Sequence, residues 1–236
     1  MSGGAPMENE HENPDRRPLA TRSLGVSQTL ARRIAATGIT PNAISVAGMA
    51  AGVLAGVALA GTAQFPNQAR WLWLAGAALV QLRLLANMFD GMVAIETGKT
   101  SAVGELFNEV PDRVSDAATL IGLGYAAGSH PAAGFAAACV ALFVAYVRAM
   151  GKATGAGQQF CGPMAKPQRM FFVTMAALWC GLAPEAWRTW AGVGVPVWVL
   201  GLVVLGGAVT AVRRLSKISR ALNSAMPPEL REAGET

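Results

Sequence analysis

Histidine, cysteine and charge are all scarce in this sequence of 236 residues. Its two histidines, His11 and His130, are too few for a histidine zinc site and argue against a histidine-based catalytic triad. The three cysteines have no CxxC spacing, and their odd number argues against a disulfide framework. Charged residues make up 14% of the chain, whereas soluble domains carry about 25%. Any chemistry therefore rests on carboxylates and cations.

Long apolar runs account for the scarcity of charge. Hydrophobic residues make up 53% of the chain, and the mean hydropathy is +0.37. A helix needs about 20 mainly apolar residues to cross a bilayer. Six segments come close to or exceed this length: 41–63, 71–95, 105–128, 132–150, 170–186 and 191–212. The sequence therefore predicts an all-α polytopic membrane protein with six transmembrane helices.

The distribution of basic residues orients these helices. Most of the 19 Lys and Arg residues fall on one side if both termini are cytoplasmic, as the positive-inside rule requires. Residues 1–22 have no apolar h-region and are expected to form a disordered cytoplasmic tail. Residues 216–236 are expected to form a cytoplasmic C-terminal tail. Four tryptophans are expected at the outer interface: Trp71, Trp73, Trp187 and Trp190.

The segment before the first span has features of its own. Residues 23–38 alternate Leu and Ile with two arginines, which is typical of an amphipathic helix on anionic headgroups, although an ordinary juxtamembrane connector explains the pattern equally well. Thr40 and Pro41 then predict the N-cap and first position of a helix. Glycines at 48, 52 and 56 predict close packing of that helix inside the bundle.

Acid and amide side chains recur at helical spacing in the second and third spans. Arg83, Asn87 and Asp90 share one face of the second. The third carries a longer stripe of Glu105, Asn108, Glu109, Asp112 and Asp116. A charge at bilayer depth costs about 2.5–3.5 kcal/mol. The two stripes are therefore expected to face an inward cavity, open to the cytoplasm through the loop 96–104.

Three interpretations of this cavity are open. Arg83 and Arg113 could balance the acids in an intramembrane salt-bridge network. The acids could line a transport pathway, although they gather at one membrane face instead of spanning it. They could also bind a metal, because oxygen-only ligands favour hard cations such as Mg²⁺, Mn²⁺ or Ca²⁺. A hard dication in a basic cavity suits a diphosphate held for phosphoryl transfer.

The spacing of the polar residues resembles a family signature. From Asn87 to Asp112 the chain follows, without insertion, the pattern D-x2-D-G-x2-A-R-x8-G-x3-D-x3-D of the CDP-alcohol phosphotransferases. Asn87, Ile95 and Asn108 depart from it. The resemblance implies the fold of that family, with residues 39–215 as a six-helix transmembrane catalytic domain. It also implies transfer of a phosphatidyl-type group from a CDP-lipid to a hydroxyl acceptor, with release of CMP, in phospholipid biosynthesis.

The same resemblance assigns roles to individual residues. The implied metal ligands are Asn87, Asp90, Asn108 and Asp112, with Glu105, Glu109 and Asp116 as nearby additional ligands. Asp112 would also act as the base toward the acceptor hydroxyl. Close approach of the CDP-lipid to the backbone is implied at Gly91, Ala94 and Gly104. Binding of a phosphate of the acceptor or of the lipid is implied at Lys166 and Arg169, although topology alone also places basic residues there.

The same resemblance implies a cofactor and partners, and together with the distribution of basic residues it implies a location. It implies one or two Mg²⁺ or Mn²⁺ ions, a CDP-lipid donor, a hydroxyl-bearing acceptor, surrounding membrane lipids and a homodimer, with no nucleic-acid partner. The expected location is a bacterial inner membrane with the active site at the cytoplasmic face. Asn87 and Asn108 can ligate only through neutral amide oxygens, which weakens the case for two metals. A catalytically silent relative that binds lipid or nucleotide, or stabilises a partner, is the alternative.

Overall fold

The computed structural model of the chain describes residues 25–98 and 102–225, apart from the side chains of residues 26, 102, 103 and 105. Nearly all of this length is helical, as the sequence predicts. The α-helices are α1 (Gly25–Ala36), α2 (Pro41–Gln64), α3 (Ala69–Glu96), α4 (Ala102–Gly124), α5 (Pro131–Ala153), α6 (Lys166–Leu182) and α7 (Val195–Ala225). Short elements join some of them: the 3-10 helices η2 (Pro66–Gln68) and η3 (Glu185–Trp187), and the strands β1 (Thr189–Trp190) and β2 (Val193–Gly194). The expected N-terminal tail, 1–22, lies outside the described residues.

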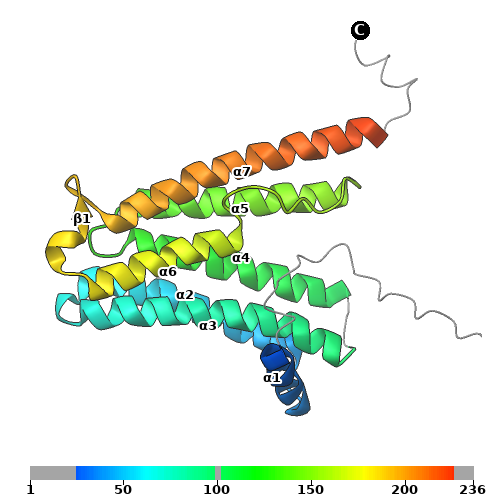
Figure 1. Cartoon of the computed structure of the whole chain (residues 1–236), viewed down its shortest axis with the longest axis horizontal. Helices are drawn as coiled ribbons and strands as arrows, with labels where there is room; N and C mark the ends of the chain where they lie inside the picture. The colour runs from blue at the N-terminus through cyan, green and yellow to red at the C-terminus, as the bar shows by residue number, and fades with distance from the viewer. Residues whose placement is uncertain (1–24, 99–101, 226–236) are drawn as a thin grey trace, which may run out of the picture.

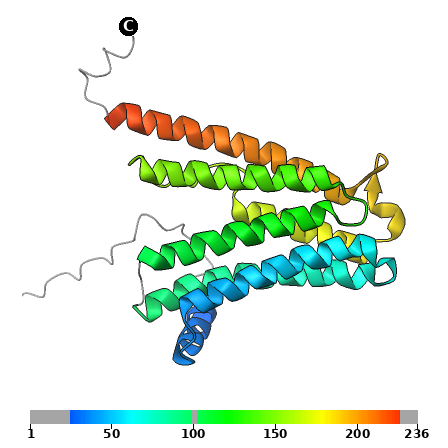
Figure 2. The ribbon, with the colours of Figure 1, turned by 180° about the vertical axis from the view of Figure 1, so that it is seen from behind.

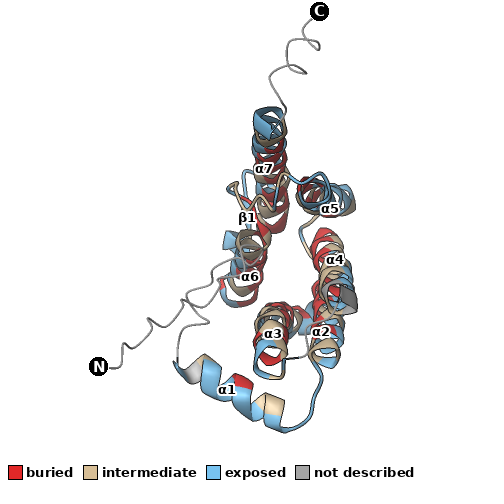
Figure 3. Cartoon of the chain, turned by 90° about the vertical axis from the view of Figure 1, so that its right-hand side faces the viewer, coloured by how far each residue is buried: buried red, intermediate tan, exposed pale blue. Residues whose placement is uncertain are grey.

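Six of the helices run lengthwise beside one another (Figures 1 and 2). Each packs on two neighbours, so that α2, α4, α5, α7, α6 and α3 follow one another around a closed ring. Figure 3 shows this ring end-on, with α1 lying outside it and packing on α3. An ion pair between Arg32 and Glu96, 3.4 Å from Nε to Oε1, joins α1 to the end of α3. Elements from both halves of the chain therefore enclose one interior.

Four segments in the described part of the chain are long and apolar enough to cross a membrane. They are Pro41–Gln64, Pro66–Glu96, Pro131–Ala153 and Val195–Ala225. The predicted third and fifth spans form α4 and α6, which do not meet that standard. The acid stripe lowers the hydropathy of α4, and α6 has only 17 residues. The predicted count of six spans is thus not confirmed, although all six predicted helices form.

The outer surface of the ring is apolar. Leu54, Val57 and Leu205 are 55%, 62% and 70% exposed, respectively, as expected for helices that face lipid. Trp71 is also exposed, but Trp73 is only 1% exposed. The prediction that Trp73 lies at the outer interface is therefore wrong, because residues two apart lie on opposite sides of a helix and Trp73 packs inward.

Small residues bring α2 and α4 into backbone contact. A Cβ added to Gly122 would lie 2.2 Å from the carbonyl oxygen of Gly56. The predicted close packing of α2 is confirmed by this contact. At its start, Thr40 Oγ1 accepts a hydrogen bond from Ala43 N at 3.2 Å, with Pro41 as the first helical residue, as predicted. These contacts fix the position of α2 against the two helices that carry the polar stripes.

The last helix differs from the prediction at both ends. Residues 189–194 form an antiparallel hairpin, with positive φ at Ala191 and Gly192, so the helix begins at Val195 instead of 191. It then continues to Ala225, through residues 216–225 of the predicted tail. The positive-φ turn explains the late start, because such backbone angles cannot be accommodated in a right-handed helix.

Candidate active site

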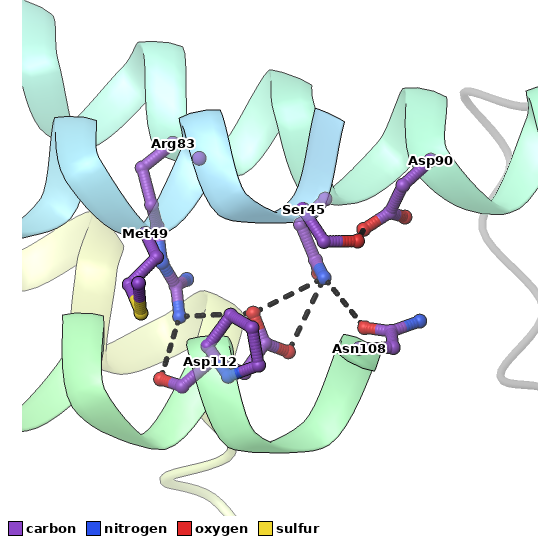
Figure 4. Close-up of a pocket in the computed structure, with 9 residues that line it drawn as sticks. Ser45, Met49, Arg83, Asp90, Asn108 and Asp112 are labelled. Atoms are coloured by element: carbon purple, nitrogen blue, oxygen red, sulfur yellow. Dashed lines mark hydrogen bonds and ion pairs between the residues drawn. The ribbon is translucent and has the colours of Figure 1, made fainter. Parts of the chain in front are cut away.

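A pocket lies between α2, α3 and α4, where the two polar stripes meet (Figure 4). Its lining consists of Ser45, Gly48 and Met49 from α2, Arg83, Asn87 and Asp90 from α3, and Asn108, Pro111 and Asp112 from α4. The stripes face one another, as the sequence predicts. α4 remains helical through Pro111, which belongs to the lining. All four residues matched to the signature acids therefore line one pocket.

Asp90 is held by the first helix of the ring. The Ser45 hydroxyl donates a hydrogen bond to Asp90 Oδ2 at 2.7 Å, and the two side chains face each other in Figure 4. Asp90 is only 3% exposed. Its other oxygen, Oδ1, is buried and has no hydrogen-bond partner among the described residues. The residue itself belongs to the lining of the pocket.

The two asparagines and Asp112 form a hydrogen-bonded group. Asn87 Nδ2 donates to Asn108 Oδ1 at 3.2 Å and lies 3.1 and 3.2 Å from the two oxygens of Asp112. Arg83 reaches the same residue, 3.4 Å from Nη2 to Asp112 Oδ1. Figure 4 shows these contacts converging on Asp112 from α3. The Asp112 carboxylate is thereby fixed in orientation at the pocket wall.

Lys166 enters the same group from the first residue of α6. Its ammonium forms an ion pair with Asp112 Oδ2 and donates a hydrogen bond to Asn87 Oδ1 at 2.8 Å. The Lys166 side chain is 18% exposed. A residue from the second half of the chain therefore lies against the matched residues of α3 and α4.

Asp116 is one helical turn further along α4 and is paired with two arginines. Its carboxylate forms ion pairs with Arg83 and with Arg169 Nη2, the latter at 2.8 Å. All three side chains are at most 3% exposed. Arg83 Nε also donates to Ser115 Oγ at 2.9 Å. These contacts form a buried salt-bridge network, as one interpretation of the sequence expected, with Arg169 as a cation that this interpretation did not name. Asp116 does not line the pocket.

Glu109 also has two basic partners, on another side of α4. It forms ion pairs with Arg113, four residues along the same helix, and with Arg148 of α5. It does not line the pocket. The third additional ligand suggested by the sequence, Glu105, has a side chain outside the described part of the structure. Neither Glu109 nor Asp116 is therefore brought to the four matched residues as an extra ligand.

Gly91 and Ala94 lie in the last turns of α3, and Gly104 lies in the first turn of α4. None of the three is in the lining of this pocket. Their role in CDP-lipid binding stays a prediction. The same holds for phosphate binding by Lys166 and Arg169, since both cations form ion pairs with aspartates in this structure.

Two contacts of the pocket had no signal in the sequence. Ser45 is one of a few polar residues in a largely apolar helix, and only the packing of α2 on α3 brings it to Asp90. Lys166 is separated from Asn87 by 79 positions, and its reach to Asp112 depends on how α6 closes the ring. Helical spacing predicts which residues share a face, but not which residue of a distant helix will meet them.

Residues 38–213 match the model of the CDP-alcohol phosphatidyltransferase family. The chain belongs to this family. It is 29% identical over 220 residues to the phosphatidylinositol phosphate synthase of Mycolicibacterium smegmatis, covering 89% of this chain and 91% of that relative. The matched region holds every residue of the pocket.

Solved structures share the fold. The phosphatidylinositol phosphate synthase of Mycobacterium tuberculosis in complex with manganese and citrate superimposes with a TM-score of 0.66 at 24% identity, covering 81% of this chain and 88% of that one. Its complex with CDP-DAG gives a TM-score of 0.65 at 24% identity, covering 83% and 94%. The arrangement of helices is therefore that of the CDP-alcohol phosphatidyltransferases. The placement of Asn87 and Asn108 at aspartate positions stays a prediction.

The donor atoms of the pocket suit one divalent cation. Asp90 and Asp112 offer carboxylate oxygens, and Asn87 and Asn108 offer amide oxygens, which are the ligands that Mg²⁺ and Mn²⁺ accept. The buried Oδ1 of Asp90, without a partner among the described residues, is the acceptor best placed for a cation. No three His, Cys, Asp or Glu side chains in the described ranges gather closely enough for a metal centre. The number of ions that the pocket would hold stays a prediction.

Proposed function

We propose that this protein transfers a phosphatidyl-type group from a CDP-lipid, of the CDP-diacylglycerol kind, to a hydroxyl-bearing acceptor and releases CMP. Family membership supports the class of reaction. The relatives named phosphatidylinositol phosphate synthases, one of them solved with CDP-DAG bound, support a CDP-lipid donor. The observation that carries the proposal is that Asp90 of α3 and Asp112 of α4 line one pocket.

The reaction replaces one phosphorus–oxygen bond by another. The acceptor hydroxyl oxygen would bond to the lipid-side phosphorus while the bond from that phosphorus to CMP breaks. Asp112 would take the hydroxyl proton. Its orientation is set by Asn87, which donates toward both of its oxygens, and by the ion pair with Lys166. A proton acceptor positioned in this way typically contributes about 10²–10⁴-fold to the rate.

Asp90 would serve the donor side of the reaction. When bound, Mg²⁺ or Mn²⁺ would supply positive charge against the diphosphate. Asp90 and Asp112 would hold it through carboxylate oxygens, and Asn87 and Asn108 through amide oxygens. The Ser45 hydroxyl keeps Asp90 turned into the pocket and leaves Oδ1 free.

The membrane setting suits a lipid substrate. The exposed apolar surface of the ring would contact the bilayer, with residues 39–215 as the catalytic domain. We propose that both termini and the pocket are cytoplasmic, in a bacterial inner membrane. In a cysteine-free background, an impermeant thiol reagent added outside should label a cysteine at position 67 and spare those at 98 and 157. The reverse labelling pattern would refute this orientation.

The acceptor is proposed only as a class. Relatives named phosphatidylinositol phosphate synthases make a phosphorylated inositol the first compound to test. Phosphate binding by Lys166 and Arg169 would require one of their ion pairs to open. The CDP-lipid contacts at Gly91, Ala94 and Gly104, and a homodimer, are kept as further parts of this proposal.

The test is CMP release by the purified protein in lipid nanodiscs. CDP-diacylglycerol would be supplied with a panel of hydroxyl acceptors, with Mn²⁺ or Mg²⁺ and with chelator. Turnover should require both the acceptor and the divalent cation. Asp112→Asn should lower kcat by about 10²-fold or more. Asp90→Asn should chiefly weaken binding of metal and CDP-lipid. Glu185→Gln, an exposed acid in η3, should leave turnover unchanged.

The opposite result would identify a silent family member. If the folded protein binds CDP-diacylglycerol but releases no CMP with any acceptor, the lipid- or nucleotide-binding alternative stands and the transferase proposal fails. If Asp112→Asn has near-normal turnover, the protein is an enzyme but the pocket is not its working site.

A further inference from the structure

Two basic residues of α6 form ion pairs with two acids of α4. Lys166 and Arg169 are three positions apart, and Asp112 and Asp116 are four apart, so each pair shares one face of its helix. Lys166 is ion-paired with Asp112, and Arg169 with Asp116. The second pair is buried, with both side chains 3% exposed. The register between α6 and α4 therefore holds the Lys166 ammonium at Asp112.

The start of α6 is anchored independently of these pairs. Met164 N, just before the helix, donates to Thr210 Oγ1 of α7 at 3.0 Å. Gly162 packs on the same residue: a Cβ there would lie 2.4 Å from Thr210 Cγ2, and the glycine has a φ of 115°. Met164 and Ala165 are both buried. Lys166 thus extends from a fixed point of the backbone.

Asn87 is the type of residue that this arrangement needs. Its amide oxygen accepts from the Lys166 ammonium while its amide nitrogen donates toward Asp112. An aspartate at this position has no donor for Asp112 when ionised. The amide can bridge an ammonium and a carboxylate that are themselves paired. The asparagine and the lysine therefore form one unit.

The charges around the pocket already balance. Within the described side chains, the carboxylates of Asp90, Asp112 and Asp116 are accompanied by the cations Arg83, Lys166 and Arg169. Divalent cations bind where negative charge exceeds positive charge. Of these three carboxylates, Asp90 alone keeps a buried oxygen without a hydrogen-bond partner among the described residues, and Asp90 lines the pocket.

We propose that Lys166 is a resident cation of this site: its ammonium supplies, at Asp112, the positive charge that a second divalent cation would bring. The chain then binds at most one divalent cation, at Asp90. This inference rests on the proposed function for its meaning, since the positive charge would face the same diphosphate. Its test concerns metal binding alone and needs no turnover.

The experiment measures free Mn²⁺ by electron paramagnetic resonance while the purified protein is titrated without CDP-lipid. The native chain should bind no more than one Mn²⁺. Lys166→Gln should bind Mn²⁺ at least about fivefold more tightly. This is the change in affinity expected when the repulsion between two unit charges about 4 Å apart in bulk water is removed. Lys166→Arg keeps the charge and should retain native affinity. Lys217→Gln, an exposed lysine of α7, is the matched charge control and should also retain it.

A folding defect in Lys166→Gln would be recognised by its unfolding temperature. Mn²⁺ should raise that temperature more in Lys166→Gln than in the native chain, which gives a second readout on the folded fraction. Tight binding in Lys166→Gln would support the inference even if the native chain binds no Mn²⁺ and has no transferase activity. The inference would be overturned if the native chain bound two ions. It would also be overturned if Lys166→Gln bound Mn²⁺ no more tightly than the native chain, or if neither protein bound Mn²⁺.

Discussion

Asp116 offers a sharp test of how the interior is stabilised. Its carboxylate lies between Arg83 and Arg169, and all three side chains are at most 3% exposed. Asp116→Asn preserves the shape of the side chain but leaves two buried guanidinium groups without their counter-charge. Breaking a buried ion pair by removing one partner costs about 3–5 kcal/mol. The remaining amide oxygen still accepts a hydrogen bond, so we expect the lower end of that range.

The assay is thermal unfolding followed by tryptophan fluorescence in detergent. At about 2–4 °C per kcal/mol for a chain of this size, a loss of about 3 kcal/mol lowers the midpoint by about 6–12 °C. Membrane proteins often unfold irreversibly, so native chain and variant need the same scan rate. Glu185→Gln, the exposed acid of η3, should shift the midpoint very little. Folded Asp116→Asn should still bind Mn²⁺, but more weakly than the native chain, because the cluster loses one negative charge. Lost Mn²⁺ binding with an unchanged midpoint would show that Asp116 is a ligand instead of a structural anion.

Two further changes probe the packing around the pocket. Gly122→Ala should lower the unfolding midpoint, because its Cβ would lie 2.2 Å from the carbonyl oxygen of Gly56; Gly201→Ala, where nothing lies within 4 Å, is the control, and equal midpoints would contradict the backbone contact. Ser45→Ala removes the donor to Asp90 Oδ2 and should cost about 1–3 kcal/mol by leaving the buried carboxylate unsatisfied. Thermal unfolding of Ser45→Ala beside Ser45→Thr, which keeps the hydroxyl, measures that loss, and equal destabilisation by both would point to packing instead.

Much of the fold follows from local pattern. Thr40 and Pro41 predict the start of α2, and the structure places both at its N-terminus. The apolar runs predict all six ring helices, because 20 or so apolar residues bounded by polar ones have few alternatives. The number that are apolar enough to span a membrane does not follow as safely, because α4 combines a lipid-facing side with an acid stripe. Trp73 shows a similar limit, since composition does not tell which side of a helix faces lipid.

In the site, too, the contacts that follow from helical spacing could be predicted, and those that depend on the packing of distant helices could not. The shared faces of α3 and α4 predict that Asp90 and Asp112 meet, because helical spacing fixes direction. The second partner of Asp116 and of Glu109 could not be predicted, since Arg169 and Arg148 come from helices whose rotation is set by packing. The position of Lys166 depends on the register between α4 and α6, which no local pattern encodes.

The pairing of α6 with α4 also bears on how the chain is assembled in the membrane. The N-terminal half, through α4, contains Asp90, Asp112 and Asp116, with Arg83 as the cation shared by Asp112 and Asp116. The other two cations, Lys166 and Arg169, enter only with α6. Until then the nascent bundle carries uncompensated acids, each costing about 2.5–3.5 kcal/mol at bilayer depth. We therefore expect the docking of α6 to stabilise the earlier helices, and a chain truncated before residue 166 to be degraded faster by membrane proteases than the native chain.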